Sequence, residues 1–112
     1  MPYELNGVTY ETDANGYLSD PTQWSEDLAK VIAAAEGIEL TDKHWDIIHY
    51  LREEYFENNG NQPNERTILK AMSEKWGKRL QSKDTFELFP LMPSKQGAKI
   101  AGLPETRRKG GY

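Results

Sequence analysis

The chain has 112 residues, of which 37% are hydrophobic and 29% charged, and its twelve aromatic residues exclude a disordered chain. No apolar run approaches the roughly 20 residues that a membrane span needs, and the first residues carry neither the basic nor the apolar part of a secretory signal. We therefore expect one globular domain in the cytoplasm, without a membrane partner.

The N-terminal residues predict a small β-hairpin. Residues 3–10 are rich in β-formers and centre on Asn6-Gly7, the pair that a type I′ turn prefers. A second turn follows at residues 13–16, and residues 17–18 suggest a short third strand. A sheet this small is marginal alone, so it must pack on the rest of the chain.

The remaining apolar segments recur at helical spacing, each with a capping residue before it and Gly or Pro after it. Asp20 followed by Pro21 predicts a first helical turn. Further helices are predicted over residues 26–36, 42–58, 65–76, 85–89 and 95–101, with N-caps at Ser25, Thr41, Asn64 and Ser94 where a cap is identified. The sequence thus predicts one domain over residues 1–104, with the hairpin in 3–18 and helices in 20–101. A flexible arm of residues 105–112 would follow.

The chain contains no cysteine and only two histidines, His44 and His49. The first count excludes disulfide bonds, thiolate metal sites and a cysteine nucleophile. The histidines are five positions apart, whereas a helical zinc motif places its pair four apart on one face. We interpret both as ordinary residues of a helix surface, and we expect neither a metal site nor a cofactor.

Charge is distributed unevenly along the chain. Residues 1–65 carry 14 acids and 3 bases, whereas residues 66–112 carry 4 acids and 11 bases. Such asymmetry indicates an acidic or polyanionic partner for the basic half. The alternative is that the two halves pair their charges when the chain folds, and the sequence leaves both open.

The basic half also leaves nucleic acid open as a partner. The helix at 42–58, an Asn-rich loop and the helix at 65–76 resemble a helix-turn-helix, with bases continuing after the second helix. The loop is longer than the turn of about 3–4 residues in the tight motif. The overall net charge of −4 also weighs against a dedicated DNA-binding domain.

Three segments, in chain order, carry a family resemblance. They are NGYL (15–18), LTDKHWDII (40–48) with LRE (51–53), and LFP (88–90) followed by KIAGLP (99–104). Together they resemble the DsrC/TusE family of sulfur-relay proteins over nearly the whole chain. The resemblance implies a mainly helical α+β fold, in which a small N-terminal hairpin packs on a compact helical bundle and a flexible C-terminal arm follows.

The resemblance also implies a function for the arm. DsrC proteins carry sulfur on two arm cysteines and dock the arm into dissimilatory sulfite reductase, whereas TusE proteins keep one cysteine and relay sulfur toward tRNA. Here Ala98 stands where the upstream cysteine would be, and Gly111 stands at the penultimate position of the other. Twelve residues separate the two, more than the usual family spacing, and the segment between them is basic.

Without a thiolate the chain cannot form a persulfide, so no residue is expected to be catalytic and the chain is not expected to be an enzyme. We expect a regulatory or partner-binding paralogue whose protein partner is sulfite reductase or a sulfur-transfer protein. The predicted partner-binding residues are Lys99, Ile100, Gly102, Leu103, Pro104, Arg107, Arg108 and Lys109. The alternatives are a nucleic-acid-binding regulator, a cysteine-less variant of a sulfurtransferase carrier, and a paralogue that folds but has no defined partner.

Overall fold

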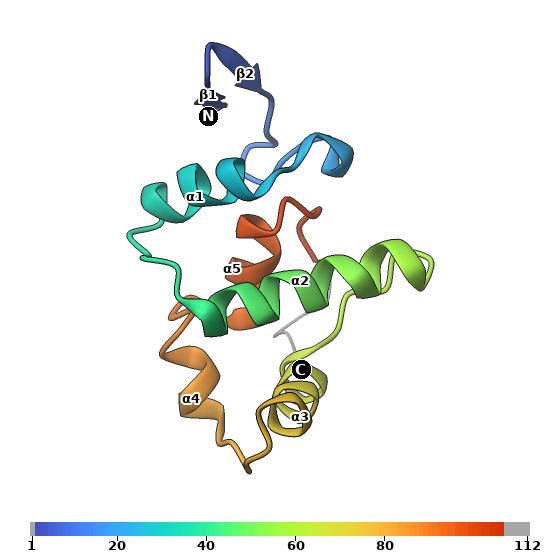
Figure 1. Ribbon diagram of the computed structural model, residues 1–112. Helices are drawn as coiled ribbons and strands as arrows, with labels where there is room; N and C mark the ends of the chain where they lie inside the picture. The colour runs from blue at the N-terminus through green and yellow to red at the C-terminus, as the bar shows by residue number, and fades with distance from the viewer. Residues whose placement is uncertain (1, 107–112) are drawn as a thin grey trace.

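The computed structural model describes residues 2–106 and has the predicted mainly helical α+β architecture. Its elements are β1 (Tyr3–Leu5), β2 (Val8–Tyr10), the 3₁₀ helix η1 (Pro21–Gln23), α1 (Glu26–Ala35), α2 (Asp42–Glu57), α3 (Glu65–Trp76), α4 (Ser82–Phe86) and α5 (Pro93–Ile100). Helix α5 packs against α1, α2 and α3, and in Figure 1 it lies behind α2. The last helix of the chain is therefore central to the fold.

The N-terminal hairpin has the predicted turn. Strands β1 and β2 pair antiparallel, with Tyr3 opposite Tyr10, and the turn residues Asn6 and Gly7 have φ of 51° and 79°. The third strand is reduced to one bridge between Thr12 and Leu18. The hairpin packs on α1, which gives the small sheet the support it needs.

Most predicted helix boundaries are confirmed, because their caps are local. The Ser25 hydroxyl accepts a hydrogen bond from the Leu28 amide at 3.1 Å, and the Asn64 side chain accepts one from the Thr67 amide at 2.9 Å. Gly77 ends α3 in the left-handed conformation, with φ of 68°. Each cap satisfies a backbone group of the first or last helical turn.

Two boundaries were predicted wrongly. Helix α4 begins at Ser82 rather than near Thr85, because the Gln81 amide donates to the Asp84 carboxylate at 2.8 Å in a capping box. Helix α5 begins at Pro93, after Met92 with φ of 91°, so Ser94 is not its N-cap. Instead the Ser94 amide donates to the buried carboxylate of Glu65 on α3, which caps α5 from another helix.

The prediction that His44 is a surface residue was also wrong. The Thr41 amide donates to His44 Nδ1 at 3.0 Å, so the ring proton lies on Nε2, 2.8 Å from the Leu88 carbonyl oxygen that accepts it. Burial lowers the pKa of this imidazole, against the opposing effect of the hydrogen bond to Leu88. His49 is exposed as predicted and lies 2.9 Å from a carboxylate oxygen of Glu26.

The hydrophobic core forms where α1, α2 and α3 meet α5. Its largest fully buried side chains come from these four helices, the α4–α5 connection and the segment after α5. They include Leu28, Ile32, Ile47, Ile48, Leu51, Ile68, Met72, Phe89, Ile100 and Leu103. In the part of the chain described, no helix combines the length and apolar character needed to cross a membrane.

Candidate partner-binding site at the base of the C-terminal arm

We call residues 99–106 the arm base, because they join α5 to the C-terminal segment. Three of the predicted partner-binding residues lie inside the protein here. Ile100 and Leu103 are 0% and 1% exposed, and Gly102 is buried beside Trp24. Their side chains and backbone belong to the core in this conformation. They can fix the course of the chain, and in this conformation they are not exposed.

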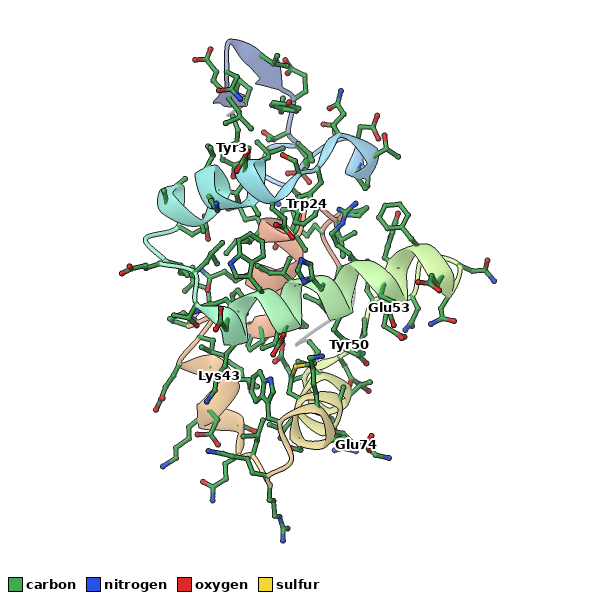
Figure 2. The ribbon with its side chains drawn as sticks, viewed as in Figure 1. Tyr3, Trp24, Lys43, Tyr50, Glu53 and Glu74 are labelled. Atoms are coloured by element: carbon green, nitrogen blue, oxygen red, sulfur yellow. The ribbon has the colours of Figure 1, made fainter. Side chains whose placement is uncertain are left out.

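Gly102 is required at its position for two reasons. Its φ of 71° lies in the left-handed region, and a β-carbon here would lie 2.8 Å from Trp24 Cγ. The indole nitrogen of Trp24 also donates to the Ile100 carbonyl oxygen at 2.9 Å. Figure 2 shows Trp24 between the segment before α1 and helix α2. This tryptophan therefore contacts the arm base on both sides of Ala101.

Side chains from α2 and the α2–α3 connection hold two further carbonyl groups of the arm base. Arg52 on α2 donates to the Ala101 carbonyl oxygen at 2.8 Å, and Gln62 donates to the Pro104 carbonyl oxygen at 2.8 Å. Backbone carbonyls that leave a helix need such partners when they are buried. The path of the arm base is thus set by side chains from distant parts of the sequence.

Arg52 is the most heavily used of these side chains. It also donates to the Pro21 carbonyl oxygen at 3.3 Å, and its guanidinium lies 4.2 Å from the ring centre of Trp24 and 4.8 Å from that of Phe56. Burial lowers the pKa of Arg52 below its very high ordinary value, and the group stays charged at neutral pH. Arginine suits this role because its planar fork stacks and donates at once.

Lys99 is engaged in an ion pair rather than free. Its ammonium lies 2.9 Å from a carboxylate oxygen of Glu36, whose other oxygen accepts from Gln96 at 3.1 Å. Burial raises the pKa of Glu36, but the hydrogen bonds from Lys99 and Gln96 and the charge of Lys99 outweigh it and leave that pKa below its ordinary value. Lys99 therefore anchors α5 to the end of α1.

The arm base stays in contact with the body up to its last described residues. Asn15 donates to the Glu105 carboxylate at 2.8 Å, and Thr106 is 9% exposed. Burial, followed by the charge of Glu105, raises the pKa of Tyr17 to about 12, so this phenol stays protonated. A hollow of about 460 Å³ adjoins this end, lined by Asp13, Pro104, Glu105 and Thr106.

The predicted site is thus only partly brought together. Pro104 is half-buried, Lys99 is paired, and Arg107, Arg108, Lys109 and Gly111 lie outside the described residues. Sequence reasoning missed Trp24, Arg52 and Gln62. Two signals pointed to Arg52: it lies in the LRE segment that carries the family resemblance, and it is one of only three bases among the first 65 residues.

The position that the resemblance assigns to the upstream cysteine is also buried. Ala98 is 1% exposed within α5, and the 112 residues contain no cysteine. Between residues 2 and 106, no group of three or more His, Asp or Glu side chains is placed to hold a metal ion. The site offers backbone-shaping contacts and surface charge, and the sequence supplies no thiol.

The fold and the site together describe a class of protein: a small helical domain with a buried last helix that leads into a C-terminal segment. A family model described as "DsrC like protein" matches residues 4–108. The chain therefore belongs to the DsrC-like family, as the resemblance indicated.

Several named proteins are similar to the chain. Sulfurtransferase TusE of Pectobacterium atrosepticum is 48% identical over 103 residues, which are 91% of this chain and 94% of that protein. The TusE homologue of Haemophilus influenzae is 47% identical over 105 residues, 93% and 95% of the two chains. The NMR structure of Allochromatium vinosum DsrC has a TM-score of 0.86 at 40% identity, covering 96% and 98% of the two chains.

A crystal structure extends this likeness. The oxidized gamma-subunit of dissimilatory sulfite reductase (DsrC) from Archaeoglobus fulgidus has a TM-score of 0.87 at 29% identity, with 96% of this chain and 98% of that chain covered. Chains from different organisms thus share this arrangement of helices, and the fold extends to the arm base of this chain.

Proposed function

We propose that this chain is a non-catalytic, partner-binding member of the DsrC/TusE family that regulates sulfur-transfer proteins. The observation that carries the proposal is a contrast between the chemistry that the chain has lost and the structure that it keeps at the arm base. The sequence has no cysteine to carry sulfur, yet three side chains, Trp24, Arg52 and Gln62, still hold the backbone of the arm base. Persulfide chemistry requires a thiolate, whereas binding does not.

The buried residues of the arm base act as its support in this proposal. Ile100, Gly102 and Leu103 fix where the chain leaves the body, and Pro104 restricts its backbone at that point. The partner contacts are assigned to Arg107, Arg108 and Lys109, which follow directly. A partner that accepts the arm of a cysteine-containing relative is the natural candidate, because the bodies are alike.

The relatives suggest which partner to test. One similar structure is described as the gamma-subunit of dissimilatory sulfite reductase, and another, at 30% identity and a TM-score of 0.77, as dissimilatory sulfite reductase I itself. We therefore propose a sulfite reductase or a sulfurtransferase as the protein to which this chain binds. By occupying the docking site without delivering sulfur, the chain would compete with the carriers.

A competition experiment tests this proposal. Fluorescently labelled DsrC of Allochromatium vinosum is bound to purified dissimilatory sulfite reductase, and this chain is titrated in. We expect displacement by the chain and weaker displacement by Arg107→Glu/Arg108→Glu. A Lys30→Glu/Lys43→Glu variant has the same change in net charge at exposed sites outside the arm and outside α3, and it serves as the matched control. Absence of displacement with both sulfite reductase and a sulfurtransferase contradicts the proposal.

Sulfur loading provides the second readout. With a cysteine desulfurase and free cysteine as sulfur donor, mass spectrometry is expected to detect no sulfur added to the chain, whereas Gly111→Cys should accept sulfur. An added sulfur atom on the unaltered chain would contradict the non-catalytic role. A cysteine-less variant of an active carrier is less favoured, because the arm also differs in length and charge. The nucleic-acid alternative gains no support from the seven-residue connection 58–64 between α2 and α3.

A further inference from the structure

The charge asymmetry of the sequence persists in the folded chain. Three close contacts between a basic and an acidic side chain occur among residues 2–106. Two of them lie within the acidic first half: Lys30–Asp27, and His49–Glu26, which is an ion pair only when the imidazole is protonated. Only Lys99–Glu36 joins the two halves. Folding therefore leaves most bases of the second half unneutralised, which removes the simpler explanation that the halves pair their charges.

These unneutralised bases are concentrated on α3 and the turn that follows it. Residues 66–83 carry six bases and a single acid, Glu74. All six bases are exposed, and none of them takes part in the ion pairs or cation–π contacts described for this part of the chain. We call this set the basic face: Arg66, Lys70, Lys75, Lys78, Arg79 and Lys83.

The outer side of α3 suits an interface. The helix buries Glu65, Ile68 and Met72 against the body, and Arg66 and Lys70 lie on its opposite, solvent-exposed side. Lys75 borders the hollow between α2 and α3, and the other three bases follow the end of the helix. Like charges on one helix repel one another, and an acidic partner relieves this repulsion. The bases therefore favour association with negative charge, chiefly by accelerating encounter and selecting the partner.

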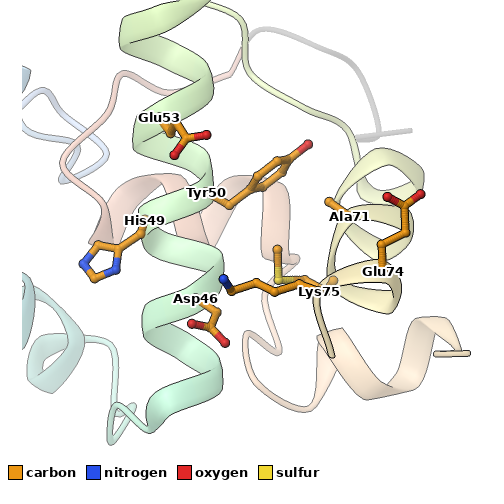
Figure 3. A pocket seen from close by; sticks show the side chains of 8 residues that line it. Asp46, His49, Tyr50, Glu53, Ala71, Glu74 and Lys75 are labelled. Atoms are coloured by element: carbon orange, nitrogen blue, oxygen red, sulfur yellow. The ribbon is translucent and has the colours of Figure 1, made fainter. Parts of the chain in front are cut away.

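The surroundings limit how large that negative partner can be. Glu53 of α2 and Glu74 of α3 both border the hollow of about 490 Å³ between these helices, together with Asp46 (Figure 3). Packed helices lie about 8–10 Å apart, so carboxylates flank the basic face within a Debye length. A nucleic-acid duplex, with a phosphate charge about every 1.7 Å, would extend over these carboxylates. A short acidic segment lying along α3 would avoid them.

We propose that the basic face binds a short acidic segment of a protein partner. The inference rests on the proposed partner-binding role, but it assigns a surface that shares no residue with the arm base. The two can therefore fail separately. Suppose that Arg107→Glu/Arg108→Glu displaces DsrC more weakly than the unaltered chain does, while the unaltered chain does not bind an acidic peptide. The proposed function is then supported and this inference is contradicted.

The test uses the full chain and a fluorescein-labelled Asp/Glu-rich peptide at low ionic strength, with binding measured by fluorescence anisotropy. We expect binding that weakens as salt is added, because exposed charge pairs are screened. Lys70→Glu/Arg79→Glu should weaken it by roughly tenfold or more, as expected for two charge reversals in the contact. Lys30→Glu/Lys43→Glu has the same change in net charge at exposed sites outside the basic face and the arm, and it should leave the affinity nearly unchanged.

Three results would overturn the inference. They are no binding of the peptide at low salt, equal weakening by the two double variants, and tighter binding of duplex DNA than of the peptide through the same bases. The last result would instead favour the nucleic-acid alternative. Circular dichroism and thermal unfolding of each variant check that its fold is intact, and we expect no change because the substituted side chains are exposed.

Discussion

The indole ring of Trp24 occupies the space in which a side chain of residue 102 would lie. A β-carbon on Gly102 would approach Trp24 Cγ to 2.8 Å, closer than packed carbon atoms come. The arm base can therefore follow its observed path only with glycine at this position. The contact between Trp24 and Gly102 thus joins the segment before α1 to the arm base.

Gly102→Ala should therefore destabilise the protein. We expect a loss of roughly 2–4 kcal/mol in the free energy of unfolding, from the left-handed φ and from displacement of Trp24. Gly37→Ala is the matched control, because Gly37 has φ of 74° but open space around it, and should cost only about 1 kcal/mol. Urea unfolding measures the loss in free energy for each variant. Equal losses would show that Trp24 can move away from residue 102 without a cost in free energy.

Arg52→Lys should weaken the attachment of the arm base although it preserves the charge. Lysine cannot reproduce the two donors that reach the carbonyl oxygens of Ala101 and Pro21, nor the stacking on Trp24. We expect a loss of roughly 1–3 kcal/mol in stability, and faster amide hydrogen exchange at residues 101–103. Arg66→Lys, at an exposed site, should change stability by less than about 0.5 kcal/mol. Identical behaviour of the two variants would contradict the assigned role of Arg52.

Stability should fall as the pH is lowered through the ordinary histidine pKa of about 6.5. Burial holds the pKa of His44 lower in the folded state, so the unfolded chain binds more protons in this range and unfolding is favoured. Protonation would also remove the acceptor that His44 Nδ1 offers to the Thr41 amide. The stability contributed by neutral His44 is present above the unfolded pKa and is lost as the pH falls through the folded pKa.

Thermal unfolding across this pH range, compared for two histidine variants, isolates the effect. His44→Gln should be less stable at neutral pH and should lose this pH dependence, whereas His49→Gln should retain it. A pH dependence that persists in His44→Gln would contradict its assignment to His44.

Ala98→Cys should place a thiol where reagents hardly reach it. Residue 98 is 1% exposed, so the added sulfur should cost about 1 kcal/mol by overpacking and react slowly with a thiol reagent. Ala35→Cys makes the same substitution at an exposed site at the end of α1 and should react at the rate of a free thiol. Equal rates would mean that α5 separates readily from the body.

The elements predicted correctly from sequence are those with local partners. The Asn6-Gly7 turn and the caps at Ser25, Asn64 and Gly77 each depend on groups a few residues away, so the sequence contains both partners of the interaction. The family resemblance rests on motifs of the same kind. Composition likewise excluded thiol chemistry, because folding cannot supply a thiol group that no residue of the chain carries.

The errors and omissions occurred where the partners are far apart in sequence. Glu65 caps α5 across 29 positions, His44 meets Leu88 across 44, and Arg52 reaches Ala101 across 49. Periodicity and capping rules cannot identify such pairs, since only chain folding brings them together. For the same reason the sequence could not decide whether its acidic and basic halves pair.

The helices, the hairpin turn, the family and the absence of a thiol all follow from residue type or short-range spacing, so they could be predicted before the chain was seen folded. The burial of Ile100, Gly102 and Leu103 could be established only from the folded chain. The tertiary structure also decided that the bases of α3 stay unneutralised. Burial and charge pairing depend on how α5 and α3 pack against distant segments, and no local pattern in the chain fixes those positions.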